Sequence, residues 1–261
     1  MPGRSEVVIP KQTVGASSAR KILKLLTYFT PDRTHARVED LAAHVDVPKS
    51  TAYRHLALLK ETGLIASGAD GRWHLAPALI RLGEAARSAV GIIELALPAM
   101  QRLSHQTQET VLLIERIGDA GVCVAKQDAP QMIRLSFEVG TGVPLHRGAG
   151  AKLLLAHLSL EEQQRYWAHA TANYADLKGR VTRLKSDLEE IRAAGHSVSS
   201  GDLMQDLWSV AAPVRRGSEV VAALSLVGPI YRMPPSAKPQ LVDAVKRSAD
   251  EISAEISRRA G

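Results

Sequence analysis

One short stretch of this chain gathers the side chains best suited to bind a polyanion. An ammonium, two hydroxyls, a phenol and a guanidinium stand within six residues, on Lys49, Ser50, Thr51, Tyr53 and Arg54. Groups of these kinds donate hydrogen bonds to phosphate oxygens and to base edges in the grooves of duplex DNA. From position 49 to position 60 there are three Lys or Arg and no Asp or Glu. We therefore interpret the stretch as a nucleic-acid contact.

Helical periodicity predicts how this stretch is presented. Apolar residues recur at three- and four-residue spacing, first at Val38, Leu41, Ala42 and Val45 and then at Ala52, Leu56 and Leu59. Pro48 suits the first position of the second helix, where its missing N–H costs nothing, and Gly63 suits the position after the last turn. The pattern predicts two helices joined by a sharp turn, with Lys49, Ser50, Tyr53 and Arg54 projecting from the start of the second.

A hairpin is expected after the second helix. Leu64 and Ile65 begin a strand, residues 68–71 form a turn between two glycines, and residues 72–75 return. With a further helix at 17–29, this is the layout of a winged helix-turn-helix, which reads duplex DNA. Arg72 in the wing then contacts phosphate or the minor groove. The alternative is that two amphipathic helices followed by a glycine show this pattern by chance, without being a DNA-binding domain.

Composition sets outer limits on the fold and its surroundings. The 261 residues suit two moderate domains. The net charge is +6, and the first 75 residues, with 11 Lys or Arg against 7 Asp or Glu, carry +4 of it, which favours polyanion binding. No apolar run approaches the ~20 residues of a membrane span, and residues 1–15 resemble a flexible arm. The single cysteine, Cys123, excludes an intramolecular disulfide and fits a reducing cytoplasm.

The remaining residues predict a second, larger domain. Residues 77–100 indicate one long helical stretch joining two domains, with a further helix starting at Pro98. Strands are expected at 111–117, 121–127 and 133–139, helices at 148–157, 160–169 and 181–194, strands at 196–200, 206–216 and 220–228, and a closing helix at 236–259. This order predicts an α+β domain with a central antiparallel sheet.

Five stretches together resemble a known family. RKILKLL and LAAHVDVPKSTAYRHLALLKETGLI look like the N-terminal domain of the IclR family of bacterial transcriptional regulators. PLHRGAGAKLLLA, LKSDLEEIRAAGHSV and SVAAPVRRGSEVVAALSLVGP resemble the family's effector-binding domain, in the same order and spacing. The resemblance runs from about Ala16 to Ala260 and covers nearly the whole chain.

The resemblance implies a cytoplasmic regulator that forms a homodimer or homotetramer, binds an operator in duplex DNA, and responds to a small-molecule effector. It implies a flexible arm at 1–15, a winged helix-turn-helix domain at 16–76, a linker helix at 77–96, and a GAF-like effector-binding and oligomerisation domain at 97–261. The effector pocket would then involve Leu135, Val143, His146, Ala149, Gly150, Leu207, Ser209, Ser225 and Val227, with Ser199 and Asp202 near its edge.

Each pocket residue also has an ordinary alternative role. Leu135, Val143 and Leu207 equally suit a plain apolar core. Ala149 and Gly150 open the helix GAGAKLLLA, whose free N–H groups suit a carboxylate, although a closely packed helix start would look the same. The stretch lacks the full G-x-x-x-x-G-K-[ST] spacing of a phosphate loop.

Departures from the family pattern bear on the effector. Ala151 stands where Gly is common, Arg147 where a small residue is, Asp206 where Gly is usual, and Ser209 where Cys is frequent. Val227 stands where a second hydroxyl would help members that bind very small polar acids. Fewer polar groups favour a larger, partly apolar effector, such as an aromatic acid or amide.

The sequence offers little for catalysis, metals or cofactors. Cys123 lies in an alternating strand pattern, where a buried thiol is the ordinary outcome. The nine histidines show no H-E-x-x-H, and neither C-x-x-C nor G-x-S-x-G occurs. We therefore expect no enzyme, no metal site and no cofactor.

The family resemblance favours repression of a catabolic operon that the effector relieves. Ligand-dependent activation of transcription is the alternative.

Overall fold

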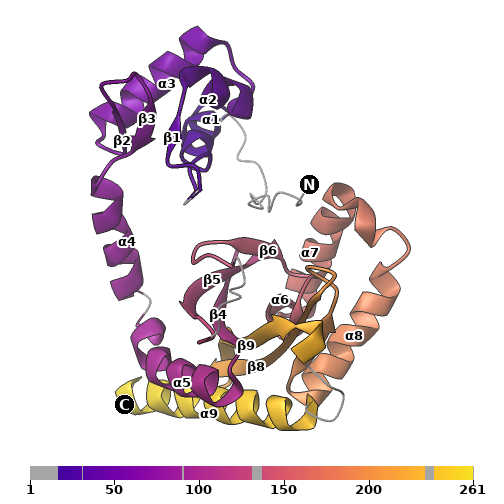
Figure 1. Ribbon diagram of the computed structural model, residues 1–261. Helices are drawn as coiled ribbons and strands as arrows, with labels where there is room; N and C mark the ends of the chain where they lie inside the picture. Colours follow the sequence, from indigo (N-terminus) through magenta and orange to yellow (C-terminus); the bar gives the residue numbers. More distant parts are fainter. Residues whose placement is uncertain (1–16, 31, 90, 131–136, 233–237, 261) are drawn as a thin grey trace. The chain divides into compact units, whose positions relative to one another are not determined.

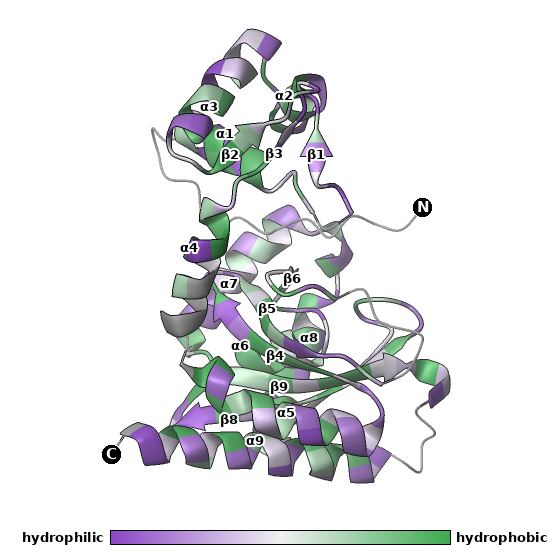
Figure 2. Ribbon diagram, turned by 60° about the vertical axis from the view of Figure 1, so that its left-hand side comes forward, coloured by the Kyte–Doolittle hydropathy of each residue, from purple (hydrophilic) through white to green (hydrophobic). Residues whose placement is uncertain are grey.

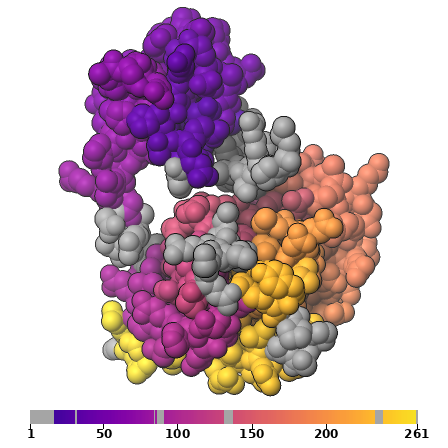
Figure 3. Space-filling model, in the orientation of Figure 1, coloured from indigo at the N-terminus to yellow at the C-terminus, as the bar shows by residue number. Residues whose placement is uncertain are grey.

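The computed structural model describes residues 17–30, 32–89, 91–130, 137–232 and 238–260. These residues divide into two compact units that meet in the sequence between Gly91 and Ile92. Side chains fill the space between the ribbons of each unit (Figure 3), and each has its own cluster of buried apolar residues.

In its described residues, the first unit contains a cluster of helices packed on a small sheet, followed by helix α4 (Ala78–Ala89) (Figure 1). The clustered helices are α1 (Ser17–Leu26), α2 (Val38–Val45) and α3 (Lys49–Glu61), and the strands are β1 (His35–Ala36), β2 (Ile65–Ser67) and β3 (Trp73–Leu75). The strands are antiparallel in the order β1-β3-β2. The predicted helix pair and hairpin are confirmed, whereas β1 carries no sequence signal, because two residues are too few to show an alternating pattern.

Backbone geometry explains both ends of α3. Asp46 ends α2 with a left-handed φ of 52°. Pro48 has an extended backbone, with a ψ of 149°, and its carbonyl accepts the first hydrogen bonds of α3. Pro48 therefore precedes the helix, whereas the sequence predicts it at the first helical position. At the other end Gly63 has a φ of 71°, and the Leu64 N–H donates to the Leu59 carbonyl at 2.9 Å. This is the Schellman arrangement that glycine favours.

The predicted joining helix is interrupted. Helix α4 spans Ala78–Ala89 and α5 spans Ile92–Thr107, so the single helical stretch expected over 77–100 is wrong. The helix expected to start at Pro98 is also wrong, because Pro98 lies inside α5. Gly91 forms a turn between the two helices, and glycine costs a helix interior about 1 kcal/mol relative to alanine.

A six-stranded antiparallel sheet forms the centre of the second unit. Its order is β6-β5-β4-β9-β8-β7. The strands are β4 (Thr110–Ile117), β5 (Ala120–Gln127), β6 (Gly142–Pro144), β7 (Ser197–Ser200), β8 (Leu207–Arg216) and β9 (Glu219–Pro229). The expected α+β class and antiparallel sheet are confirmed.

One predicted strand is corrected. Residues 131–136 lie outside the described residues, and Phe137–Val139 are not in a strand. The chain turns there instead, with the Thr141 N–H donating to the Glu138 carbonyl at 3.0 Å and Gly140 at a φ of 89°. Strand β6 follows the turn and pairs with β5.

Helices cover the sheet on both sides. Helices α5 and α9 (Lys238–Ala260) lie side by side against it (Figure 1) and carry hydrophilic and hydrophobic residues in alternation (Figure 2). Helix α6 (Ala149–Ala156) packs against the other face, and α7 (Leu160–Asn173), a short 3₁₀ turn η1 (Ala175–Leu177) and α8 (Val181–Ala194) lie outside it. A second 3₁₀ turn, η2 (Ile230–Arg232), follows β9.

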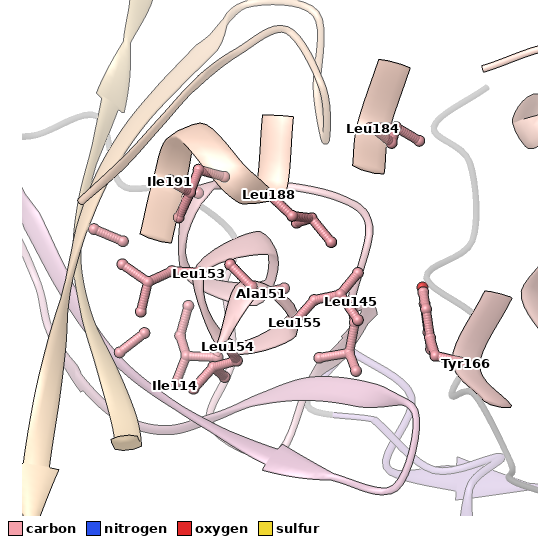
Figure 4. Packing of buried hydrophobic residues seen from close by; sticks show 14 of the residues in the cluster. Ile114, Leu145, Ala151, Leu153, Leu154, Leu155, Tyr166, Leu184, Leu188 and Ile191 are labelled. Atoms are coloured by element: carbon pink, nitrogen blue, oxygen red, sulfur yellow. The ribbon is translucent and has the colours of Figure 1, made fainter. Parts of the chain in front are cut away.

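The core on this face is built around α6, all eight residues of which are buried. A helix that is apolar all round has to lie in the interior. Figure 4 shows its residues facing one strand and one helix, with Ala151, Leu153, Leu154 and Leu155 of α6 packed among Ile114 of β4 and Leu184, Leu188 and Ile191 of α8. Helix α6 is therefore a fixed element, and its N-terminus has a defined place against the sheet.

Candidate functional site

The start of α3 presents the predicted polar side chains to solvent. Lys49, Ser50, Tyr53 and Arg54 are exposed, and Thr51 is partly exposed. The opposite face of the helix is buried against α1, α2 and the hairpin through Ala52, His55, Leu56 and Leu59. His55 was not foreseen as a buried residue, and burial lowers its pKa. The apolar spacing that buries one face of α3 thus leaves the basic face free.

Two of the three predicted cationic contacts are paired within the protein. Lys49 Nζ lies 2.9 Å from Glu39 Oε1, and this pairing raises the pKa of Lys49 and lowers that of Glu39. In the wing, Arg72 Nε lies 2.7 Å from Asp70 Oδ2, and hydrogen bonds from Arg72 lower the pKa of Asp70. Both pairs are exposed, and such pairs contribute little, so a phosphate can replace the carboxylate.

Arg54 differs from these two residues. Its Nη2 donates to Thr51 Oγ1 at 3.4 Å, and among the described residues no carboxylate lies within ion-pair distance of it. Its planar guanidinium can engage the two acceptors of a guanine edge at once. Arg54 is therefore the side chain of this face best suited to read a base.

A cavity of about 550 Å³, part of it open to solvent, lies between the sheet and the N-terminus of α6. Side chains two residues apart on a strand share a face of the sheet. Such pairs from four strands line the cavity: Leu112 and Ile114 of β4, Gly121 and Cys123 of β5, Leu207 and Ser209 of β8, and Ser225 and Val227 of β9. Strand register aligns them, because Ser209 pairs with Val227 and Leu112 with Ser225. Residues from four strands therefore meet in one wall.

Other segments add the rest of the lining. Phe137, Thr141 and Val143 come from the segment before α6, and residues 147–151 come from its start. Ser199 belongs to β7, Leu203 to the loop after β7, and Trp208 to β8. Most of these side chains are apolar. The polar groups are a few hydroxyls, one guanidinium and the backbone N–H groups at the start of α6, where N–H groups lack intrahelical partners.

Glycine is required where α6 meets the sheet. A Cβ on Gly150 would come within 2.5 Å of Ile114 Cδ1, and a Cβ on Gly121 within 2.9 Å of Ala151 Cβ. Gly148, which precedes α6, has a φ of 72°. Gly121 and Gly150 allow the helix to approach the sheet closely. At its start, the Ala149 N–H donates to Ser209 Oγ in the cavity wall at 3.2 Å.

The structure brings most of the sequence-predicted pocket residues together. Val143, Ala149, Gly150, Leu207, Ser209, Ser225 and Val227 all line the cavity, as does Ser199 from the predicted edge. Leu135 lies outside the described residues. Asp202 is not part of the wall: it forms an ion pair with Lys152 and accepts a hydrogen bond from Ser199 Oγ at 2.9 Å. The ion pair with Lys152 links the loop after β7 to α6.

His146 lies beside the cavity rather than in its wall. Its ring is buried, with Nδ1 2.6 Å from the hydroxyl of Tyr166 and Nε2 3.7 Å from Asp176 Oδ2. Burial lowers the pKa of His146 to about 4, against the opposing effect of Asp176. The imidazole is consequently neutral at pH 7 and holds the loop before α6 in place.

Sequence reasoning missed several wall residues. Leu112, Ile114 and Gly121 belong to strands that were predicted, but the register that points them at this wall is a long-range property. Arg147 stands out in the sequence only as a departure from the family pattern. It is one of the residues that line the cavity, and its Nη2 lies 2.8 Å from Asp176 Oδ2.

Catalytic and metal chemistry find little support in the geometry. Burial raises the pKa of Cys123 to about 11, so its thiol stays protonated at pH 7. Within the described part of the chain, no three His, Cys, Asp or Glu side chains gather closely enough to hold a metal ion. Across the same ranges, no helix combines the length and apolar character that crossing a membrane requires.

Comparison with known families decides the identity of the chain. Residues 84–254 match the bacterial transcriptional regulator IclR C-terminal domain, and residues 18–67 match the IclR helix-turn-helix domain. The chain belongs to the IclR family. It is therefore a DNA-binding transcriptional regulator with a ligand-binding C-terminal domain, and not an enzyme.

Individual IclR-family proteins resemble it along their whole length. The chain is 27% identical to the HTH-type transcriptional repressor AllR of Klebsiella pneumoniae, over 97% of this chain and 93% of that protein. It is 28% identical to the HTH-type transcriptional regulator KipR of Bacillus subtilis, over 90% and 95%. An IclR homolog of Microbacterium hydrocarbonoxydans, solved in complex with 4-hydroxybenzoate, has the same fold, with a TM-score of 0.77, 22% identity and coverage of 94% and 100%.

Proposed function

We propose that this IclR-family protein is a repressor of a catabolic operon that an aromatic acid or amide releases from its operator. The observation that carries the effector class is the largely apolar lining of the cavity, whose polar residues are a few Ser and Thr and Arg147. A pocket of this kind suits a ligand with an apolar body and one or two polar groups. The similarity to the AllR repressor supports repression rather than activation.

The DNA contact is proposed to be the exposed face of α3, with the wing beside it. Lys49, Ser50, Thr51, Tyr53 and Arg54 would lie in the major groove and Arg72 against the backbone. The exposure of these side chains and the basic charge of the face support this assignment. Lys49 would position the helix on phosphate, and Arg54 would read a base.

DNA binding and effector binding are proposed to belong to different domains of an oligomer. We assign DNA binding to 16–76, a linker to 77–96 that contains α4 and the start of α5, and effector binding and oligomerisation to 97–261, in a cytoplasmic homodimer or homotetramer. Exposed Ile80 and Leu82 on α4 support contact with a second copy, because they are 68% and 55% exposed. Two copies would present two α3 helices to half-sites one helical turn apart, about 34 Å.

The test is an anisotropy titration of the full-length protein on its own upstream intergenic DNA and on random DNA at fixed salt. Benzoate, benzamide, 4-hydroxybenzoate and glyoxylate form the effector panel. Tighter binding to upstream DNA that an aromatic compound weakens supports the proposal. Binding that the compound strengthens indicates activation instead, and a response to glyoxylate alone overturns the effector class.

A cavity variant separates effector response from DNA binding. Ser225 is 1% exposed in the cavity wall, and Ser225→Leu should fill the space that the ligand needs. We expect loss of the effector response with operator affinity unchanged within about twofold, which is under 0.5 kcal/mol. Loss of both together would signify misfolding, which a thermal melt of the same sample reports.

A further inference from the structure

We infer that Arg147 binds the carboxylate of the effector, so that the cavity selects an aromatic monocarboxylate over the matching amide. The inference rests on the proposed function, which leaves acid and amide open. Three observations carry it: the charge of the cavity wall, the balance of charges around Asp176, and the position of Arg147 at the start of α6.

Arg147 is the charged residue of the wall. Among the described residues that line the cavity, every other side chain is neutral. The Arg147 side chain is 35% exposed, so water surrounds it only in part. Water and salt therefore weaken its attraction for an anion less than they would on an open surface. An anion in this apolar cavity would therefore be attracted to Arg147.

Asp176 does not neutralise the surrounding positive charge. A single oxygen, Asp176 Oδ2, lies 2.8 Å from Arg147 Nη2, 3.2 Å from Arg147 Nε and 3.9 Å from Arg180 Nη1. His146 also faces this oxygen but is neutral at pH 7, since burial lowers its pKa to about 4. Asp202 also interacts with Arg180 but is paired with Lys152. Three cations, Arg147, Arg180 and Lys152, therefore share two carboxylates, and the cluster retains one positive charge.

The guanidinium also has hydrogen-bonding capacity for a second acceptor. It carries five N–H donors in a planar fork, and the contact with Asp176 involves Nε and Nη2. A carboxylate can therefore bind through Nη1 while Asp176 stays in place, or replace Asp176 and bind bidentately. An amide has no charge to compete with the Asp176 carboxylate.

The neighbouring helix strengthens the same end of the cavity. Arg147 immediately precedes Gly148, the N-cap residue of α6, and residues 147–151 all line the cavity. The N-terminus of a helix favours negative charge through its unpaired N–H groups and its dipole. The guanidinium and the first turn of α6 thus favour an anion at one end, while Leu112, Ile114 and Val227 favour an apolar ring beyond it.

The test compares benzoate with benzamide by isothermal titration on full-length protein. The wild type should bind benzoate more tightly. Arg147→Met should weaken benzoate binding by about 10- to 100-fold, as expected for loss of a charged hydrogen bond, and change benzamide binding by less than about twofold. Arg147→Lys keeps the charge without the fork and should lie between the wild type and Arg147→Met.

Two variants control for general charge effects. Arg180→Met removes the same charge from the same carboxylate, but Arg180 does not line the cavity, so benzoate affinity should change by less than about twofold. Asp176→Asn removes the competing carboxylate and should tighten benzoate binding by about two- to fivefold. Opposite effects at Arg147 and Asp176 are not expected from a change in packing alone.

Several results would overturn the inference. These are tighter binding of benzamide by the wild type, no saturable benzoate binding at millimolar concentration, equal loss of both ligands in Arg147→Met, or equal loss of benzoate in Arg147→Met and Arg180→Met. Selective binding of the unliganded wild type to operator DNA, measured on the same preparation, tests the proposed function separately. Each variant is accepted only if it keeps that binding.

Discussion

The N–H of Ala149 donates a hydrogen bond to Ser209 Oγ at 3.2 Å, which joins the N-terminus of α6 to strand β8. This bond satisfies a donor that has no partner within the helix. It also crosses the cavity wall, so it fixes the distance between two of its sides.

Replacing Ser209 by Ala should lower the free energy of unfolding by about 1–2 kcal/mol, because the Ala149 N–H then loses its acceptor in a half-buried place. Urea unfolding followed by circular dichroism measures the change. Ser218→Ala, on the exposed turn between β8 and β9, is the control and should change stability by less than about 0.5 kcal/mol. Equal values for the two variants would show that the bond contributes nothing.

Gly121 and Ala151 form a second close contact. Gly121→Ala should destabilise the protein by about 1–3 kcal/mol, because its new Cβ would stand 2.9 Å from Ala151 Cβ, with Ala151 Cα at 3.3 Å. Adding Ala151→Gly removes the obstructing methyl. Glycine at position 151 by itself costs the helix ~1 kcal/mol. The double-mutant cycle removes this cost, and we expect it to give a coupling free energy of about 1–2 kcal/mol. Simple additivity would contradict the contact.

The two basic residues of α3 should behave differently on DNA. Arg54→Ala should reduce the preference for operator over random DNA by about 1–3 kcal/mol, since it removes a base contact. Lys49→Ala should weaken binding to both DNAs and reduce the salt slope by about one unit. Anisotropy titrations over a range of salt concentrations distinguish the two. Identical profiles for both variants would place the reading face elsewhere.

Glu39 supplies a matched test of the Lys49 assignment. Glu39→Gln releases Lys49 from the ion pair of 2.9 Å and removes a negative charge near the DNA face. Affinity for operator and random DNA should therefore rise together by about two- to fivefold at low salt and converge with the wild type at high salt. A selective gain on operator DNA alone would mean that Lys49 contacts a base.

His146 makes the stability of the protein depend on pH in the acid range. Burial lowers its pKa from 6.5 to about 4, so the unfolded chain takes up this proton first as the pH falls. The stability associated with neutral His146 is present above about pH 6.5 and is lost between there and about pH 4, by about 2–4 kcal/mol in total. Unfolding free energies of the wild type and His146→Phe across this range should differ in slope; parallel curves would contradict the burial of a neutral imidazole.

Local patterns were enough to place most helices and strands. Spacing of apolar residues defined α3 and its inner face, glycines marked its end at Gly63 and the end of α8 at Gly195, and alternation located β4, β5, β8 and β9. The exposed residues of α3 followed directly, since the face that is not buried carries them. The start of α6 at Ala149 was foreseen in the same way.

Other features were beyond reach of local patterns. The two-residue β1, the interruption between α4 and α5, and the pairing of β6 at 142–144 with β5 depend on packing partners far along the chain. Arg147 was visible as an unusual residue, but its pairing with Asp176 across 29 positions was not. His146 was assigned to the pocket by resemblance, and it packs behind the wall against Tyr166 instead.

Short-range physics therefore settled which residues are helical, which are extended and which basic side chains remain exposed, because caps, turns and apolar periods act within a few residues. The cavity has a different origin. Its wall exists only because antiparallel register brings Leu112, Ser209, Ser225 and Val227 onto one face, and because Gly121 and Gly150 let α6 approach that face. Register and close packing join residues separated by tens to more than a hundred positions, so they become visible only when the chain is folded.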